Sequence, residues 1–81
     1  MFFVYILQSE QNGQYYIGST EDVPARLEQH NAGKTPSTSR YRPWILKYTE
    51  PFLTLSEARQ REQQIKAWKK PRYMVDRLRI R

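Results

Sequence analysis

The sequence predicts an α+β fold: a three-stranded antiparallel sheet flanked by helices, in the order β-β-α-β-α-α. Two β-branched and aromatic segments surround an Asn-Gly turn signal, and a third such segment is flanked by prolines. The segments between and after them have helical spacing. A chain of 81 residues can build one modest core, so residues 1–81 are expected to form a single domain.

The first two strands are expected to form a β-hairpin. Residues 2–7 and 15–18 are rich in β-branched and aromatic side chains, and the Asn-Gly pair between them favours a tight turn. Side chains alternate across a strand, so Tyr16 shares one face of the second strand with Gly18. Tyr5 of the first strand can therefore lie beside Tyr16.

A helix is expected next, with Thr20 or Asp22 as its N-cap, a proline in its first turn and a stop at Gly33. Arg26 and His30 are four residues apart in this helix. They are therefore expected to share one face.

A basic loop and a third strand are expected to follow. Residues 34–43 are polar and contain Thr, Ser and Pro, which predicts a loop, and Lys34, Arg40 and Arg42 make it basic. Residues 44–49 have strand composition and are bounded by a proline on each side.

Two further helices are predicted in the C-terminal third. Residues 54–57 have the Thr-x-x-Glu spacing of a capping box, which begins a helix that continues to about Lys70. Pro71 is expected to interrupt this helix, and residues 73–80 to form a short last one.

Glu62 is the most informative residue of the long helix. It falls on the apolar stripe, four residues after Ala58 and three before Ile65, where an apolar side chain would be expected. A buried carboxylate is costly unless it is paired or binds a metal. Two interpretations follow: a metal ligand, or a structural ion pair with one of three basic residues, Arg26, Arg59 or Lys66.

The basic residues are concentrated at the C-terminal end. The formal charge is +6, and residues 57–81 hold nine Lys and Arg against three acidic residues. This asymmetry suits a polyanionic partner, although a merely solvated surface is the alternative.

The absence of cysteine excludes disulfides and Cys-based zinc sites, and no apolar run approaches the roughly 20 residues of a membrane span. A soluble, cytoplasmic protein is expected.

Other site chemistries are limited by what the chain lacks. His30 is the only histidine, so a multi-histidine zinc site is excluded within one chain. Its two interpretations are a catalytic group and a helix-end histidine that interacts with the helix dipole. No glycine-rich phosphate loop, nucleophile elbow or second acid beside Glu62 is present, which argues against nucleotide hydrolysis, acyl transfer and a two-metal nuclease.

The ordered set of motifs resembles the GIY-YIG nuclease domain, and most closely its small stand-alone members. The resemblance runs from Phe3 to about Lys70. It rests on five features: Val4-Tyr5-Ile6, Tyr16-Ile17-Gly18, Arg26, His30 one turn later, and Glu62 on a later helix.

The resemblance implies a role for each motif residue. Glu62 would be the ligand of a divalent metal, Mg²⁺ or Mn²⁺, and Arg26 would hold the scissile phosphate. Tyr5, Tyr16 and His30 would position or deprotonate the attacking water, and which tyrosine is the base stays open. Gly18 would be the structural glycine of the second motif.

The expected activity is metal-dependent endonucleolytic hydrolysis of nucleic acid, DNA rather than RNA, with structure-selective or weak specificity, as in DNA repair or recombination. Two departures from the family pattern are Phe3-Val4-Tyr5 in place of Gly-Ile-Tyr and the lack of any asparagine after Asn31. The candidate phosphate contacts are Lys34, Arg40, Arg42, Lys66, Lys69, Lys70 and Arg72.

Two other functions fit the same sequence. One is a nucleic-acid-binding module of this fold with weak or no catalysis. The other is a protein-interaction domain that exposes Trp44, Trp68 and Tyr73 as an apolar patch.

Overall fold

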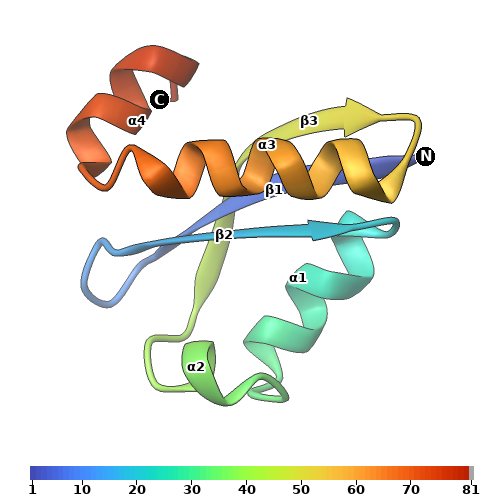
Figure 1. The fold of residues 1–81 in the computed structure, drawn as a ribbon. Helices are drawn as coiled ribbons and strands as arrows, with labels where there is room; N and C mark the ends of the chain where they lie inside the picture. Colours follow the sequence, from blue (N-terminus) through green and yellow to red (C-terminus); the bar gives the residue numbers. More distant parts are fainter. Residues whose placement is uncertain (81) are drawn as a thin grey trace.

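A computed structural model describes residues 1–80, which form a three-stranded antiparallel sheet with helices on both of its faces (Figure 1). The predicted α+β class is confirmed. The elements are β1 (Phe2–Ser9), β2 (Tyr15–Thr20), α1 (Val23–Asn31), α2 (Pro36–Ser39), β3 (Trp44–Phe52), α3 (Leu55–Ala67) and α4 (Pro71–Leu78).

The strand order is β2-β1-β3, so the first strand is central and the hairpin partner β2 is an edge. The hairpin register pairs Tyr5 with Gly18 and Leu7 with Tyr16. Directly paired residues point to the same face of a sheet. The register therefore places both motif tyrosines on one face, as the sequence predicted.

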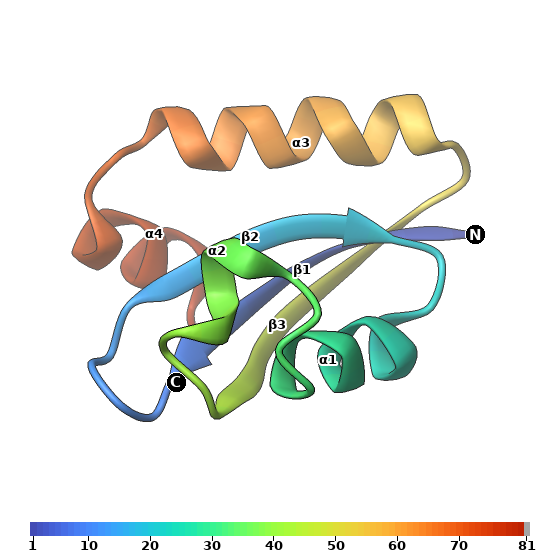
Figure 2. The ribbon, with the colours of Figure 1, turned by 90° about the horizontal axis from the view of Figure 1, so that it is seen from below.

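The two faces of the sheet carry separate apolar clusters. Helix α3 contacts all three strands on one face, and α1 contacts β1 and β3 on the other (Figures 1 and 2). The α3 face is centred on Val4, Ile6 and Ile65, and residues of α4 pack into the same cluster. The α1 face contains Tyr5 and Trp44. Short chains bury little surface, so β1 is covered on both sides to form a core.

The third strand is longer than predicted. It runs to Phe52 and includes Pro51, which was expected to end it. A proline is tolerated here because β3 is an edge strand whose outer side needs no ladder hydrogen bond. A bulge opposite the Ile6/Leu7 step shifts the register, so that Trp44 packs on the α1 face and Tyr48 on the α3 face.

The helix boundaries confirm some predictions and correct others. Asp22, not Thr20, is the N-cap of α1, because its side chain accepts a hydrogen bond from the backbone of Ala25. The predicted capping box of α3 is present. The segment predicted as a loop at 34–43 contains the one-turn helix α2, which begins at a proline. Pro71 does not merely interrupt a helix but begins α4.

No helix within residues 1–80 is long and apolar enough to cross a membrane.

Candidate active site

Tyr5 is the centre of the candidate site. Its side chain is 1% exposed, and its ring crosses the neighbouring strand above Gly18. A Cβ atom at position 18 would lie 2.5 Å from the Tyr5 hydroxyl oxygen and 2.6 Å from its ring carbon Cζ. The missing side chain of Gly18 is thus what lets the phenol reach the β2 edge of the sheet.

His30 lies beneath the two tyrosines and is fully buried. Its Nε2 atom lies 2.9 Å from the Tyr5 hydroxyl oxygen, and its Nδ1 atom lies 2.8 Å from Oγ1 of Thr38. The His30 ring centroid is 4.7 Å from that of Tyr16. Both imidazole nitrogens are therefore engaged inside the protein.

The direction of these hydrogen bonds follows from counting protons. The Thr38 hydroxyl donates its single proton to the carbonyl oxygen of Thr35 at 3.3 Å, so it accepts from His30 Nδ1–H. Burial, helped by the nearby Arg26 charge, lowers the pKa of His30, so the ring is neutral at pH 7. Its bare Nε2 atom then accepts the proton of the Tyr5 hydroxyl.

A neutral, buried imidazole does not support the interpretation of His30 as a helix-end histidine that interacts with the helix dipole. The ring is enclosed and carries no charge for the helix dipole to stabilise. His30 instead lies between a phenol and a threonine hydroxyl.

Arg26 completes the hydrogen-bonded chain. Its Nε–H group donates to the Tyr5 oxygen at 3.4 Å, and its Nη1 atom donates to Gln29 at 2.8 Å. Because Arg26 and His30 are one helical turn apart, both reach the same phenol, as the spacing predicted. The hydrogen bond to Tyr5 raises the pKa of Arg26, so the guanidinium is charged at every relevant pH.

The two tyrosines differ in environment. Their ring centroids are 6.2 Å apart, but Tyr16 is half-buried whereas Tyr5 is enclosed. Burial is the main cause that raises the pKa of Tyr5 to about 12, and the Glu62 carboxylate adds a smaller effect in the same direction. Tyr5 is therefore protonated at neutral pH, and Tyr16 is the phenol that faces solvent.

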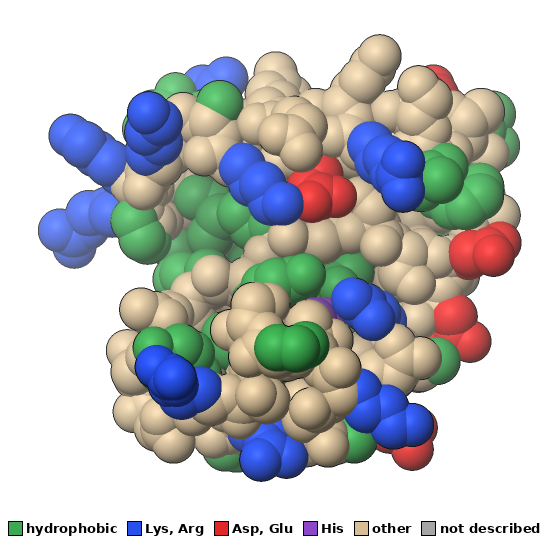
Figure 3. All heavy atoms as spheres, turned by 60° about the horizontal axis from the view of Figure 1, so that its bottom comes forward, with side chains coloured by type: hydrophobic (Ala, Val, Ile, Leu, Met, Phe, Trp, Pro, Cys, Tyr) green, Lys and Arg blue, Asp and Glu red, His purple; other side chains and the backbone are tan. Residues whose placement is uncertain are grey.

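Glu62 approaches the same edge strand from the opposite side. It is half-buried on α3, and its carboxylate accepts hydrogen bonds from the Ser19 hydroxyl and, at 2.6 Å, from Lys66 Nζ. Ser19 adjoins Gly18, but its side chain points to the α3 face. Tyr5 and Glu62 thus lie on opposite faces of β2, beside the consecutive residues Gly18 and Ser19, and Figure 3 shows charged side chains on both sides of a hollow in the surface.

The structural ion pair that was the alternative interpretation of Glu62 is present, with Lys66 as the partner. The Lys66 side chain is 46% exposed, whereas that of Glu62 is 14% exposed. Because Lys66 is the exposed partner, its release from the pair would return it to solvent at small cost. The pairing therefore leaves the carboxylate available to another cation.

The donor set suits a weakly held, hydrated magnesium ion better than a closed metal site. Within residues 1–80 no group of three or more His, Cys, Asp and Glu side chains could enclose an ion. A carboxylate offers about four lone-pair positions, of which Ser19 and Lys66 use two. Magnesium commonly takes one or two carboxylates and completes its shell with water and phosphate oxygens.

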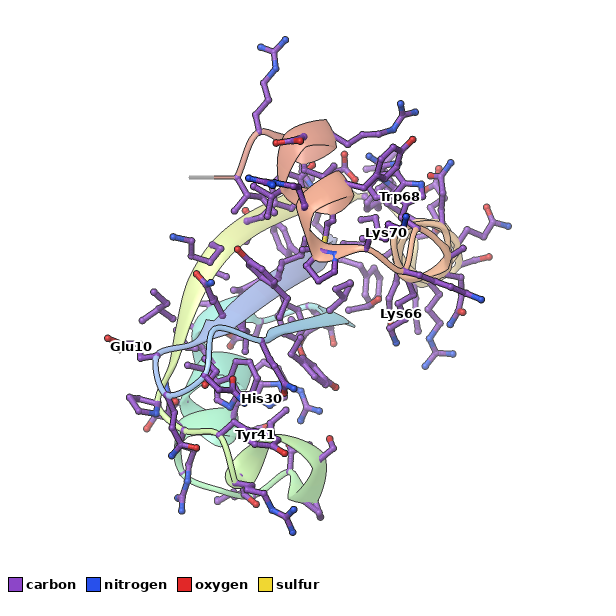
Figure 4. All side chains as sticks on the ribbon, turned by 90° about the vertical axis from the view of Figure 1, so that its left-hand side faces the viewer. Glu10, His30, Tyr41, Lys66, Trp68 and Lys70 are labelled. Carbon is purple, nitrogen blue, oxygen red and sulfur yellow. The ribbon has the colours of Figure 1, made fainter. Side chains whose placement is uncertain are left out.

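The seven basic residues expected to contact phosphate are all exposed. Lys66 in the last turn of α3 and Lys70 at the start of α4 lie on the other side of the sheet from His30 (Figure 4). Arg42 also stabilises the local fold, because its guanidinium packs over Gly33 and donates to the Ser39 carbonyl oxygen at 2.8 Å.

Three residues that support the site were missed by sequence reasoning. Thr38 comes from α2, within the segment predicted as a loop. Trp44 Nε1–H donates to the Thr38 carbonyl oxygen at 2.8 Å and so holds α2 in place. Asn31 exchanges two hydrogen bonds with the Trp44 backbone, at 2.6 and 3.0 Å. The only local signal was the Thr-Pro pair that begins α2.

The same contacts correct the apolar patch expected for a protein-interaction domain. Trp44 is 4% exposed and belongs to the core beside Tyr16. Of the three aromatic residues proposed for that patch, only Tyr73 is exposed, and it packs edge-on against the half-buried Trp68.

Comparison with known proteins agrees with the fold and with the family that the motifs resemble. The model of the GIY-YIG catalytic domain matches residues 1–74. A UPF0213 protein of Halobacterium salinarum is 43% identical over 67 residues, which span 82% of this chain and 86% of that protein. One from Staphylococcus haemolyticus is also 43% identical, over 82% of this chain and 80% of that protein.

A solved structure is similar to this chain in both sequence and fold. The solution NMR structure of the UPF0213 protein BH0048 from Bacillus halodurans is 36% identical in sequence and superimposes with a TM-score of 0.50. The match covers 83% of this chain and 72% of that one.

Proposed function

Because the chain belongs to the GIY-YIG catalytic domain family, we propose that it is a divalent-metal-dependent endonuclease that hydrolyses phosphodiester bonds in DNA. One observation carries the proposal: a continuous hydrogen-bonded chain from Arg26 through Tyr5 to His30. A buried polar chain of this kind costs desolvation, and apolar side chains could fill the same space. It has the parts needed to accept a proton beside a bound phosphate.

The Tyr5–His30 pair is the proposed proton acceptor. A phenol with a pKa of about 12 is not a standing base at neutral pH. Its own proton, however, already points at the bare Nε2 atom of His30. The Tyr5 oxygen can therefore take a proton from the attacking water while its hydroxyl proton passes to the imidazole.

Arg26 and Tyr16 are the proposed substrate contacts. The hydrogen bond from Arg26 to Tyr5 is long, at 3.4 Å, so the guanidinium can turn toward a phosphate at small cost and expose the phenol oxygen. There it would offset the charge that develops in the transition state. Tyr16, which is half-buried at the same surface, would orient the water.

Glu62 is the proposed metal ligand. A bound Mg²⁺ or Mn²⁺ ion would supply Lewis-acid stabilisation of the phosphate oxygens. Lys66 would leave the carboxylate and contact phosphate instead, which its exposed position allows. The Ser19 hydroxyl would keep the carboxylate oriented toward the β2 edge.

The test is cleavage of plasmid, branched DNA and RNA with Mg²⁺, Mn²⁺ or EDTA. Glu62→Gln keeps the hydrogen bond to Ser19 but removes the charge, and it should lower cleavage at least about 100-fold. The thermal unfolding temperature should change little. Metal-dependent cleavage at the wild-type rate by this variant would refute the assignment of Glu62.

The second candidate is a nucleic-acid-binding module with little catalysis. It is favoured by the Glu62–Lys66 pair and by the absence of any asparagine after Asn31. In that case DNA should bind with a steep salt dependence, but no metal should produce cleavage.

A further inference from the structure

A cavity lies between the β1–β2 turn and the junction of α3 with α4. Its volume is about 480 Å³, within the range of about 300–1,000 Å³ that holds small ligands. Its walls include the apolar side chains of Tyr15, Ile17, Ile65 and Met74. These belong to the cluster on the α3 face, so the floor of the cavity is the edge of the core.

The rim of this cavity is basic. Lys66, Lys69 and Lys70 line it, and all three are exposed. Figure 3 shows hydrophobic side chains at the floor of a hollow with Lys and Arg side chains along its border. An apolar floor with a cationic rim complements a ligand that has a flat apolar part and an anionic part.

The backbone at Lys69 is unusual for a lysine. Its φ is 63°, in the left-handed region that usually holds glycine or asparagine at the end of a helix. The chain thus places a charged residue where the turn itself favours glycine. Glycine can therefore replace this lysine without backbone strain, so Lys69→Gly removes the charge while suiting the local backbone.

Lys66 links the cavity to Glu62 of the candidate active site. This residue lines the cavity and also bonds to Glu62 at 2.6 Å. Since α3 rises about 1.5 Å per residue, the lysines begin about 6 Å beyond Glu62 along the helix. A strand with one phosphate at Glu62 would carry its neighbouring nucleotide to this cavity.

We infer that this cavity holds one unpaired nucleotide of the substrate strand next to the cleaved bond. The base would lie on the floor against Tyr15, and the adjoining phosphates would contact the lysines. A duplex does not fit, because its bases are paired and stacked and cannot enter a cavity of this size. The inference rests on the proposed function and adds a preference for single-stranded or unpaired substrate regions.

The experiment measures binding by fluorescence anisotropy in EDTA at about 0.1 M salt, where phosphate contacts are still visible. The probes are a labelled oligonucleotide of about 12 thymidines, an abasic strand of the same length and a blunt duplex. The thymidine strand should bind about tenfold more tightly than the abasic strand, which has the same phosphates but no bases. It should also bind more tightly than the duplex.

Two variants that each lose one positive charge separate the cavity from general charge. Lys69→Gly removes the cation at a position that suits glycine, so the fold should be retained or slightly stabilised. It should weaken binding of the thymidine strand about fivefold, whereas Arg59→Gln, on an exposed part of α3 outside the cavity, should change it less than about twofold.

A third variant tests the floor. Tyr15→Leu keeps an apolar side chain but removes the aromatic ring, and it should abolish most of the preference for bases over abasic sugars. Equal binding of thymidine and abasic strands by the wild-type protein would overturn the inference. So would equal effects of Lys69→Gly and Arg59→Gln, or binding of thymidine monophosphate as tight as that of the strand.

The two proposals fail separately. A preference for unpaired bases without cleavage in any metal would remove the nuclease and leave the nucleotide site. Metal-dependent cleavage that is unchanged by Lys69→Gly and Tyr15→Leu would remove the nucleotide site and leave the nuclease.

Discussion

The two faces of the sheet are built on the same central strand but differ in chemistry. Strand β1 gives Val4 and Ile6 to the α3 face, where the buried cluster is entirely apolar. It gives Tyr5 to the α1 face, where the fully buried residues include His30 and Thr38. One face therefore resembles an ordinary core, and the other encloses a polar network.

The polar network on the α1 face is not explained by stability alone. Every buried side-chain nitrogen and oxygen within residues 1–80 has a hydrogen-bond partner, so the network on the α1 face is fully satisfied. Satisfied buried networks fix geometry but seldom stabilise more than apolar packing does. On the α1 face, polar groups thus take the place of apolar packing, and their hydrogen bonds fix the orientation of phenol, imidazole and guanidinium.

The largest expected effect tests whether the polar face serves catalysis. Arg26→Ala should lower cleavage about 10²–10³-fold, because it removes the cation proposed to stabilise the transition state. DNA affinity should fall much less. Arg59→Ala, an exposed arginine of α3, is the matched control and should leave the rate near wild type. Comparable losses in both variants would show that charge alone matters.

The pH dependence of stability should also report on the polar face. Tyr5 has its pKa raised from 10.0 to about 12, so its contribution is complete below pH 10 and is lost as the pH rises toward about 12. The loss should be roughly 2–3 kcal/mol. Denaturant unfolding of wild type and Tyr5→Phe between pH 8 and 12 isolates it, because the variant lacks this loss.

His30 gives the acid limb of the same profile. Its pKa is lowered from 6.5 by burial and by Arg26, so its contribution is complete above pH 6.5 and is lost as the pH falls toward the folded value. His30→Gln should flatten this limb only. A wild-type profile that stays level below pH 6.5 would contradict a buried neutral imidazole.

Gly18→Ala should disturb the polar face through packing alone. The new Cβ atom would lie 2.5 Å from the Tyr5 hydroxyl oxygen, which forces the ring to move and should cost about 1–3 kcal/mol of stability. In a Tyr5→Leu background the same substitution should cost clearly less. Urea denaturation of the four proteins of this cycle measures the coupling.

Thr38→Val should test the tautomer of His30. Valine removes the acceptor of the Nδ1–H group and leaves it unsatisfied, which should cost about 1 kcal/mol or more and lower cleavage. Thr38→Ser keeps the acceptor and should behave nearly as wild type. The ¹⁵N shifts of the imidazole ring show the tautomer directly, and unchanged shifts in Thr38→Val would contradict the assignment.

The smallest effect is expected on the apolar face. Arg61 pairs with Glu50 at 2.8 Å and lies over the Trp68 ring, but both charged side chains are partly exposed. Arg61→Gln should therefore lower the free energy of unfolding by less than about 1 kcal/mol. Chemical denaturation checks this, and a larger loss would mean that polar contacts support both faces.

The sequence predicted the parts of the site that depend on local geometry. Alternation along the strand put Tyr16 and Gly18 on one face of β2. The four-residue spacing put Arg26 and His30 on one face of α1. The Thr54–Glu57 capping box fixed where α3 begins. Each of these patterns is set by backbone hydrogen bonding within a few residues, so it can be read from the chain alone.

The tertiary structure decided the partners. His30 is hydrogen-bonded to Tyr5, 25 residues earlier in the chain, and Glu62 to Ser19, 43 residues earlier. No local sequence pattern specifies either pair. Thr38 reaches the imidazole only because the short helix α2 is held by Trp44. Such contacts depend on how the helices pack on each face of the sheet, which is determined by the whole core rather than by neighbouring residues.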